Sequence, residues 1–109
     1  MKSERFIKER DDVFDEYQRQ TNMTFNQLKK WSDDPCSRKA SLSRGPLRRN
    51  IRLKSKEKEK WNRGDVRDAK RTLRFLSRHK KQSRGNEISE DCPFSKRTVA
   101  LRNWGYDPL

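Results

Sequence analysis

Side chains that could carry out acid–base, nucleophilic or metal chemistry are few and badly placed for it. The chain has one histidine, His79, and two cysteines, Cys36 and Cys92, whose spacing does not match a zinc site. Adjacent carboxylates occur at residues 33–34 and 90–91, but neighbours in sequence point to different faces of a helix. No glycine-rich loop of the phosphate-binding type is present. We therefore expect a protein that is not an enzyme and that binds neither a metal ion nor a cofactor.

The binding of anions is a second kind of chemistry, and residues 63–81 indicate it strongly. At about 100° per residue, the cations of this segment fall within an arc of about 100° that no acid enters. These cations, called the basic stripe below, are Arg63, Arg67, Lys70, Arg71, Arg74, Arg78 and Lys81. A solvated helix face usually mixes both signs in i,i+4 pairs, whereas a stripe of one sign repels itself. The pattern therefore favours a helix face that meets an anionic partner.

The residue types in the basic stripe favour a phosphate backbone as the anion. Arginine outnumbers lysine there, and its forked guanidinium suits phosphate and guanine. Asn and Gln are absent from this face, so we expect backbone contacts with weak sequence preference. A helix over residues 62–81 would be ~30 Å long, enough to follow several phosphates. Further contacts are expected from Arg38, Lys39, Arg44, Arg48, Arg49 and Arg52.

These features predict a nucleic-acid-binding protein, with double-stranded DNA as the favoured ligand and a nucleoid-associated or regulatory role. Structured RNA and an acidic surface of a partner protein fit the same stripe. A solvated basic face without any partner is the simplest alternative, and all of these stay open at this point. A membrane surface is not expected, because no Trp borders the apolar side of the helix and a small domain needs that side for its core.

Composition limits the core and places the charge. The 109 residues are 28% hydrophobic and 41% charged, so a single helical domain over residues 1–109 is expected. The net charge of +13 is concentrated in residues 38–84, which carry +15, while each flank carries −1. No apolar run reaches the ~20 residues of a membrane span, and the first residues do not resemble a secretion signal. We expect a cytoplasmic protein of the nucleoid with reduced Cys36 and Cys92; a disulfide between them is the alternative.

The pattern typical of a helix start occurs three times. In each case a polar N-cap residue is bracketed by an apolar pair that can pack as a hydrophobic staple. The caps are Thr24, Asn62 and Ser95, with the pairs Met23 and Leu28, Trp61 and Val66, and Phe94 and Val99. Ser3 and Pro46 suit the start of two further helices, and Gly105 suits the end of the last. We expect an all-α bundle of four to five short helices near 3–20, 24–33, 46–56, 62–82 and 95–104, with flexible loops at 35–45 and 83–93.

The three tryptophans could stack on unpaired bases, but their positions favour the core. Trp31, Trp61 and Trp104 each lie at a predicted helix boundary, where a staple or core position is expected. The tail after Trp104 is expected to pack over the core, because a small domain has little apolar surface to spare. His79 is expected at the border of the apolar side of its helix, beside Phe75.

Two short segments resemble a known family. Residues 22–31 read NMTFNQLKKW, and residues 103–109 read NWGYDPL. They resemble a small uncharacterised prokaryotic family with an NMT-x-x-EL-x-x-W start and an NWGHDPL end, whose members are often labelled DNA-binding proteins. The resemblance covers about residues 13–109, with Gln27 where the family tends to have Glu and Tyr106 in place of His. It implies DNA binding as an expectation, and the charge argument does not depend on it.

Overall fold

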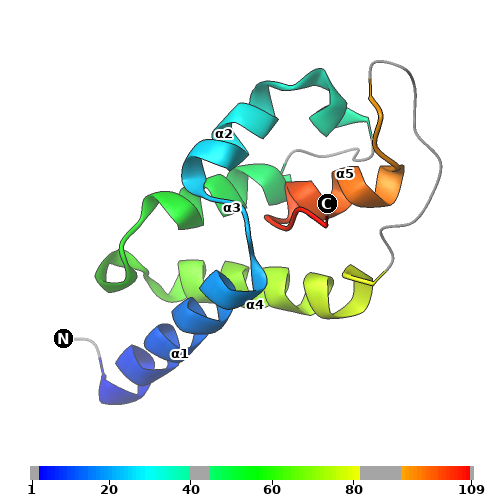
Figure 1. Cartoon of the computed structure of the whole chain (residues 1–109). Coiled ribbons are helices and arrows are strands. Elements are labelled where there is room, and N and C mark those ends of the chain that lie inside the picture. The colour runs from blue at the N-terminus through cyan, green and yellow to red at the C-terminus, as the bar shows by residue number, and fades with distance from the viewer. Residues whose placement is uncertain (1–2, 40–44, 82–91, 109) are drawn as a thin grey trace.

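The chain folds into α-helices joined by short connections. A computed structural model describes residues 3–39, 45–81 and 92–108, and this part of the chain contains no β-strand (Figure 1). Its α-helices are α1 (Glu4–Gln20), α2 (Phe25–Asp33), α3 (Gly45–Ser55), α4 (Arg63–His79) and α5 (Lys96–Asn103). Two short 3-10 helices are η1 (Pro35–Arg38) and η2 (Lys58–Lys60). The all-α prediction is confirmed, and none of the helices described combines the length and apolar character needed to cross a bilayer.

The predicted helix starts are confirmed by their hydrogen bonds. The Thr24 side chain accepts a hydrogen bond from the Gln27 N–H, and the Gln27 side chain accepts one from the Thr24 N–H. Asn62 and Asp65 form the same reciprocal capping box at the start of α4. Such a box satisfies two of the N–H groups that a helix start leaves unpaired. The other predicted caps are also present: Ser3, Ser95 and the left-handed Gly105, with φ of 86°.

Two boundaries differ from the sequence prediction. The first part of the predicted loop 35–45 forms η1, because the Asp34 side chain accepts a hydrogen bond from the Cys36 N–H and caps the turn. Helix α4 ends at His79, before the predicted end at residue 82. Within the two predicted flexible loops, residues 40–44 and 83–91 lie outside the described residues, whereas Cys92 near the end of the second loop is described and is buried.

The core consists of two clusters that share α3. One cluster joins α2, η1, α3 and the α5 region, and its buried residues are Met23, Leu28, Trp31, Cys36, Leu47, Cys92 and Val99. The other joins α1, the end of α3 and α4, and its buried residues are Phe6, Tyr17, Leu53, Trp61, Val66 and Ala69. Figure 1 shows this division, with α2 above, α3 and α5 at mid-height, and α4 and α1 below. Helix α3 therefore anchors α4 to the rest of the molecule.

The buried side chain of Asn50 links α3 to both α1 and α4. Its Oδ1 accepts hydrogen bonds from the Tyr17 hydroxyl at 2.8 Å and from the Thr72 hydroxyl at 3.0 Å. Its Nδ2 donates to the Pro46 carbonyl at 2.8 Å. A buried polar group costs free energy unless its hydrogen bonds are made. Tyr17, Asn50 and Thr72 are all buried, and their side chains provide these hydrogen bonds for one another. The set therefore fixes α1, α3 and α4 relative to each other.

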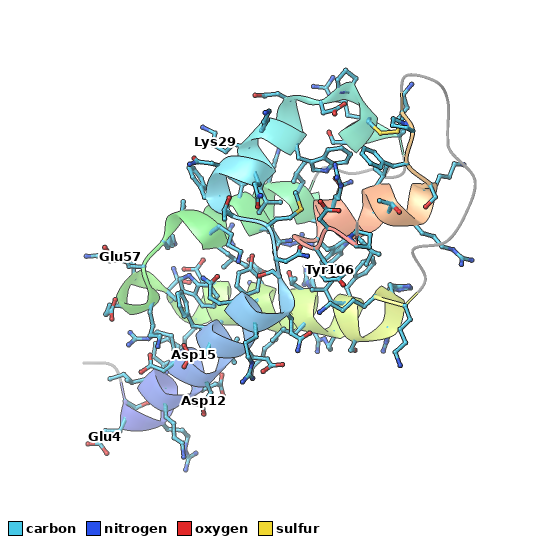
Figure 2. The ribbon with its side chains drawn as sticks, viewed as in Figure 1. Glu4, Asp12, Asp15, Lys29, Glu57 and Tyr106 are labelled. Atoms are coloured by element: carbon cyan, nitrogen blue, oxygen red, sulfur yellow. A yellow bond between two sulfur atoms is a disulfide. The ribbon has the colours of Figure 1, made fainter. Side chains whose placement is uncertain are left out.

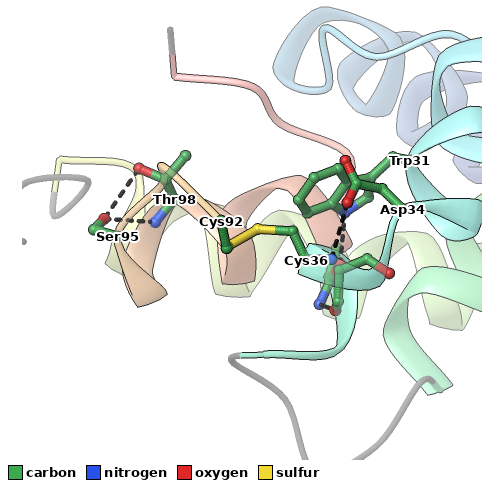
Figure 3. Close-up of a disulfide and its surroundings, with 8 residues drawn as sticks. Trp31, Asp34, Cys36, Cys92, Ser95 and Thr98 are labelled. Carbon is green, nitrogen blue, oxygen red and sulfur yellow. Dashed lines mark hydrogen bonds between the residues drawn. A yellow bond between two sulfur atoms is a disulfide. The ribbon is translucent and has the colours of Figure 1, made fainter. Parts of the chain in front are cut away.

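The expectation of two reduced cysteines is wrong, because Cys36 and Cys92 form a disulfide (Figure 3). Their Cα atoms are 5.2 Å apart, within the range that a disulfide requires. The bond joins η1 to the segment before α5, close to Trp31, and both cysteines are buried. Sequence alone could not pair them, since they are 56 residues apart and only the fold brings η1 next to α5.

The two segments that resemble the uncharacterised family pack against each other. The Asn22 side-chain amide donates to the Asp107 carbonyl at 2.7 Å and accepts from the Asp107 N–H at 2.6 Å. The Trp31 indole donates to Asn103 Oδ1 at 2.8 Å, and the Asn103 amide donates to the Ser37 carbonyl at 3.0 Å. The first pair of bonds holds the tail at Asp107 beside the start of α2, and the second pair ties the end of α5 to α2 and η1.

Candidate nucleic-acid interface

Helix α4 buries one side in the core and presents the basic stripe to solvent. Val66, Ala69 and Leu76 are buried, and Leu73 is half-buried. Helices α1 and α3 both pack on α4, so the apolar side is covered from two directions. Every cation of the basic stripe is exposed. The stripe is therefore one surface along a helix that the core holds in place.

An ion-pair cluster at the start of α4 fixes this helix on α3. Asp65, only 2% exposed, accepts a hydrogen bond from Lys56 Nζ at 2.8 Å and lies 3.3 Å from Arg52 Nε. Burial alone would raise the pKa of Asp65, but hydrogen bonds from Lys56 and from the Asn62 N–H hold this pKa below its ordinary value. Arg52 also donates to Asp68 Oδ2 at 2.5 Å. Arg52, predicted as a nucleic-acid contact, thus pairs with two carboxylates of α4.

The first edge of the basic stripe lies against α1, which carries acidic side chains. Lys70 Nζ is 3.1 Å from Glu9 Oε1, and both side chains are about half-exposed. The Arg63 guanidinium lies over the Phe6 ring, 4.8 Å from its centroid. Further acids lie along α1, as Figure 2 shows for Glu4, Asp12 and Asp15. Helix α1 therefore limits the basic surface on this side and neutralises one of its cations.

The second edge of the basic stripe ends at three aromatic rings, called the aromatic ledge below. The Phe75 and Trp104 rings are stacked, with centroids 4.3 Å apart and planes at 8°. The His79 ring lies 4.4 Å from Phe75, and all three residues are half-buried. The rings line a cavity of about 230 Å³ together with three cations of the stripe, Arg71, Arg74 and Arg78. Positive charge and aromatic surface therefore meet at this edge.

Sequence reasoning did not connect the aromatic ledge with the basic stripe. Trp31 and Trp61 are buried as predicted, at 4% and 0% exposure. Trp104 is only half-buried, because it follows α5 as its C-cap and leans on α4 instead of entering either cluster. The sequence did contain a sign that Phe75 borders the basic stripe, because at about 100° per residue it lies about 40° from Arg71 around the helix.

Arg49 adds a further cation at the aromatic edge. Its guanidinium carbon lies 5.6 Å from the centroid of the Trp104 ring, and its Nε has no hydrogen-bond partner within the described ranges. Burial and then the positive charge of Arg71 lower the pKa of Arg49, and Asp68 offsets this only in part. Like charges that lower each other's pKa indicate a local excess of positive charge, which an anion would neutralise.

The remaining predicted contact residues lie elsewhere. Arg38 and Lys39 are exposed at the end of η1, which packs on α2 and α5 and lies away from α4 (Figure 1). Arg48 is exposed on α3. Arg44 is outside the part of the chain that the structure describes. Arg38 and Lys39 therefore do not extend the surface of the basic stripe.

Most of the basic stripe has no acidic partner in the described part of the chain. Lys70 pairs with Glu9, whereas no ion pair is formed there by Arg63, Arg67, Arg71, Arg74, Arg78 or Lys81. From Arg63 to Arg78 the helix extends ~22 Å at 1.5 Å per residue. Exposed guanidinium groups on a rigid helix can bind successive phosphates of a backbone. No group of three side chains suited to hold a metal ion occurs in residues 3–39, 45–81 and 92–108.

Comparisons with known proteins do not assign the chain to a family. No protein-family model, curated protein or solved structure matches it. The resemblance of residues 22–31 and 103–109 to an uncharacterised prokaryotic family therefore stays a prediction. The features that indicate a function are the geometry and charge of α4 and its neighbours.

Proposed function

We propose that the protein binds double-stranded DNA through contacts between the basic stripe and the phosphate backbone, with weak sequence preference. The observation that carries this proposal is the row of exposed cations along α4 without acidic partners among the residues described. On this proposal the protein is a binding protein and not an enzyme. A nucleoid-associated or regulatory role fits such an activity.

The pairing of other charges supports this interpretation over mere solubility. The fold does pair cations with acids, both within elements and across them. These pairs include Lys58 with Asp15, Lys56 with Asp65, Arg52 with Asp68 and Arg102 with Asp107. Several acids of the described chain are thus paired with cations away from the basic stripe, and Glu9 is the acid that pairs with a cation of the stripe. A surface kept free of acids is expected where an external anion supplies the opposite charge.

The residues that border the stripe support weak sequence preference. Ser77, a small polar residue on the α1 side of the stripe, donates its hydroxyl to the Arg74 carbonyl. No Asn or Gln lies on this face to pair with the edge of adenine. Arginine can bind guanine, but an exposed row of arginines on a straight helix also suits phosphates of any sequence. Affinity should therefore vary little among duplex sequences.

The salt dependence of duplex binding tests the proposal. Engagement of six cations predicts that log K falls with log salt concentration with a slope near −5, since each phosphate contact contributes about −0.9. The measurement is fluorescence anisotropy of a labelled blunt duplex at several KCl concentrations. A flat salt response, or no binding at low salt, would contradict the proposal. An RNA hairpin and an acidic peptide titrated in parallel address the other two anions, and tighter binding of either one would also contradict it.

A further inference from the structure

The aromatic ledge is a second binding feature beside the basic stripe. Phe75, His79 and Trp104 bring three ring systems together on the surface of α4 and the end of α5. The near-parallel Phe75 and Trp104 rings, at 8°, stack face to face, so each ring covers one face of the other and the ring surface that remains lines the cavity. None of the three is fully buried, unlike Trp31 and Trp61 in the core. Core packing alone therefore does not account for their position.

The cavity at the ledge combines the two properties that single-stranded nucleic acid requires. Its volume of about 230 Å³ exceeds the ~150 Å³ of an apolar cavity that holds benzene. Arg71, Arg74 and Arg78 line it with the rings, and Arg49 lies over Trp104. Proteins that bind unpaired strands use aromatic rings for the bases and cationic side chains for the backbone. The same combination occurs here.

The aromatic ledge lies beside the basic stripe and can bind only bases that are not paired in a duplex. Bases inside a duplex are stacked on their neighbours and cannot reach a protein ring, whereas unpaired bases can. Arg71, Arg74 and Arg78 belong both to the stripe and to the cavity. A backbone that follows the stripe would therefore arrive at the rings without a break in its cationic contacts.

We infer that the aromatic ledge binds an unpaired nucleobase of a DNA strand whose duplex portion lies on the basic stripe. The ligand class is thus duplex DNA with a short single-stranded extension. This inference rests on the proposed function, because the stripe supplies the duplex contact. Stacking of one base on aromatic side chains should strengthen binding about tenfold over the same strand without the base.

The test separates base contacts from phosphate contacts. Three labelled ligands are compared by fluorescence anisotropy at one salt concentration: a blunt duplex, the duplex with a short thymidine 3′ extension, and the duplex with an abasic extension of equal length. The two extended ligands carry the same phosphates, so any difference between them comes from the bases. The ledge predicts about tenfold tighter binding of the thymidine extension than of the abasic one.

Variants locate the effect on the ledge. Trp104→Leu should remove the preference for the base-bearing extension while leaving blunt-duplex affinity unchanged. Phe75→Leu is a second test, should Trp104→Leu alter the end of α5. Tyr106→Leu is the matched control, because Tyr106 lies two residues after Trp104 in sequence but packs under Lys80 and does not line the cavity. This control should keep the preference.

The outcomes distinguish the two proposals. Equal binding of the thymidine and abasic extensions, with duplex binding intact, would overturn the ledge and leave the proposed function standing. Binding of the thymidine extension without binding of the blunt duplex would overturn the proposed function and support the ledge. Loss of the preference in Tyr106→Leu to the same degree as in Trp104→Leu would also overturn the ledge, and failure of every ligand to bind would overturn both.

Discussion

Substitution of Glu9 should strengthen DNA binding, because Glu9 is the acid that pairs with a cation of the basic stripe. Lys70 Nζ and Glu9 Oε1 are 3.1 Å apart, and the two side chains are 46% and 50% exposed. An ion pair this exposed is worth about 0.2–1 kcal/mol, so removing it should leave the stability of the fold nearly unchanged. In Glu9→Gln, Lys70 becomes available as a seventh cation.

The expected magnitude follows from that count. The slope of log K against log salt should steepen by about 0.9, from near −5 to near −6. Affinity at low salt should rise about two- to fivefold, corresponding to loss of an exposed pair of this strength. Anisotropy titrations of a blunt duplex at several KCl concentrations measure both quantities.

A matched control separates this geometry from net charge. Asp12 is an exposed acid of the same helix, and Asp12→Asn changes the net charge by the same amount as Glu9→Gln. No ion pair of Asp12 occurs within the described ranges. Asp12→Asn should leave the slope near −5. Equal slopes for the two variants would refute the assignment of Lys70 and Glu9 to the edge of the DNA-binding surface.

Three further predictions concern the scaffold. Reduction of the Cys36–Cys92 disulfide, which closes a loop of 56 residues, should lower the free energy of unfolding by up to about 4 kcal/mol in urea titrations; an unchanged midpoint would show that the bond contributes nothing. Asn50→Leu should cost about 2–5 kcal/mol, because the hydroxyls of Tyr17 and Thr72 lose their acceptor; a cost below about 1 kcal/mol would contradict the role of Asn50 as a link. Burial lowers the pKa of Lys54 to about 8, so between pH 8 and the ordinary lysine pKa near 10.4 the unfolded chain binds a proton that the folded chain has lost. The free energy of unfolding should therefore rise with pH over this range, relative to that of Lys54→Met. Parallel pH profiles of unfolding free energy for the two proteins would show that this pKa shift is wrong.

The parts of the fold that local chemistry determines could be predicted from the sequence. The caps at Thr24, Asn62 and Ser95 are local signals, since each depends on residues within one turn of the helix start. The exposed basic stripe could be found for the same reason, because the angular position of a residue around a helix depends only on its number. The apolar side of α4 had to face the core in a chain with so few hydrophobic residues.

Contacts between distant segments could not be predicted in this way. Pairing of Arg52 with Asp65 and Asp68 requires the angle between α3 and α4, which no local pattern specifies. The stacking of Trp104 on Phe75 requires the end of α5 to reach α4. The type of Arg52 suggested contact with an anion, but in the fold it pairs with carboxylates of α4. The type of Trp104 suggested burial in the core, but in the fold it stacks on Phe75 at the surface.

The most direct test of the account is whether DNA binding depends on the position of positive charge or only on its amount. One variant replaces Arg67, Arg71, Arg74 and Arg78 with Gln. Its control replaces four exposed cations of α2 and η1, namely Lys29, Lys30, Arg38 and Lys39, and so has the same net charge. The first variant should lose most of its duplex affinity, and its slope of log K against log salt should become shallower, from near −5 to near −2. The control should keep both the affinity and the slope. Equal losses in the two variants would contradict the claim that α4 carries the binding surface.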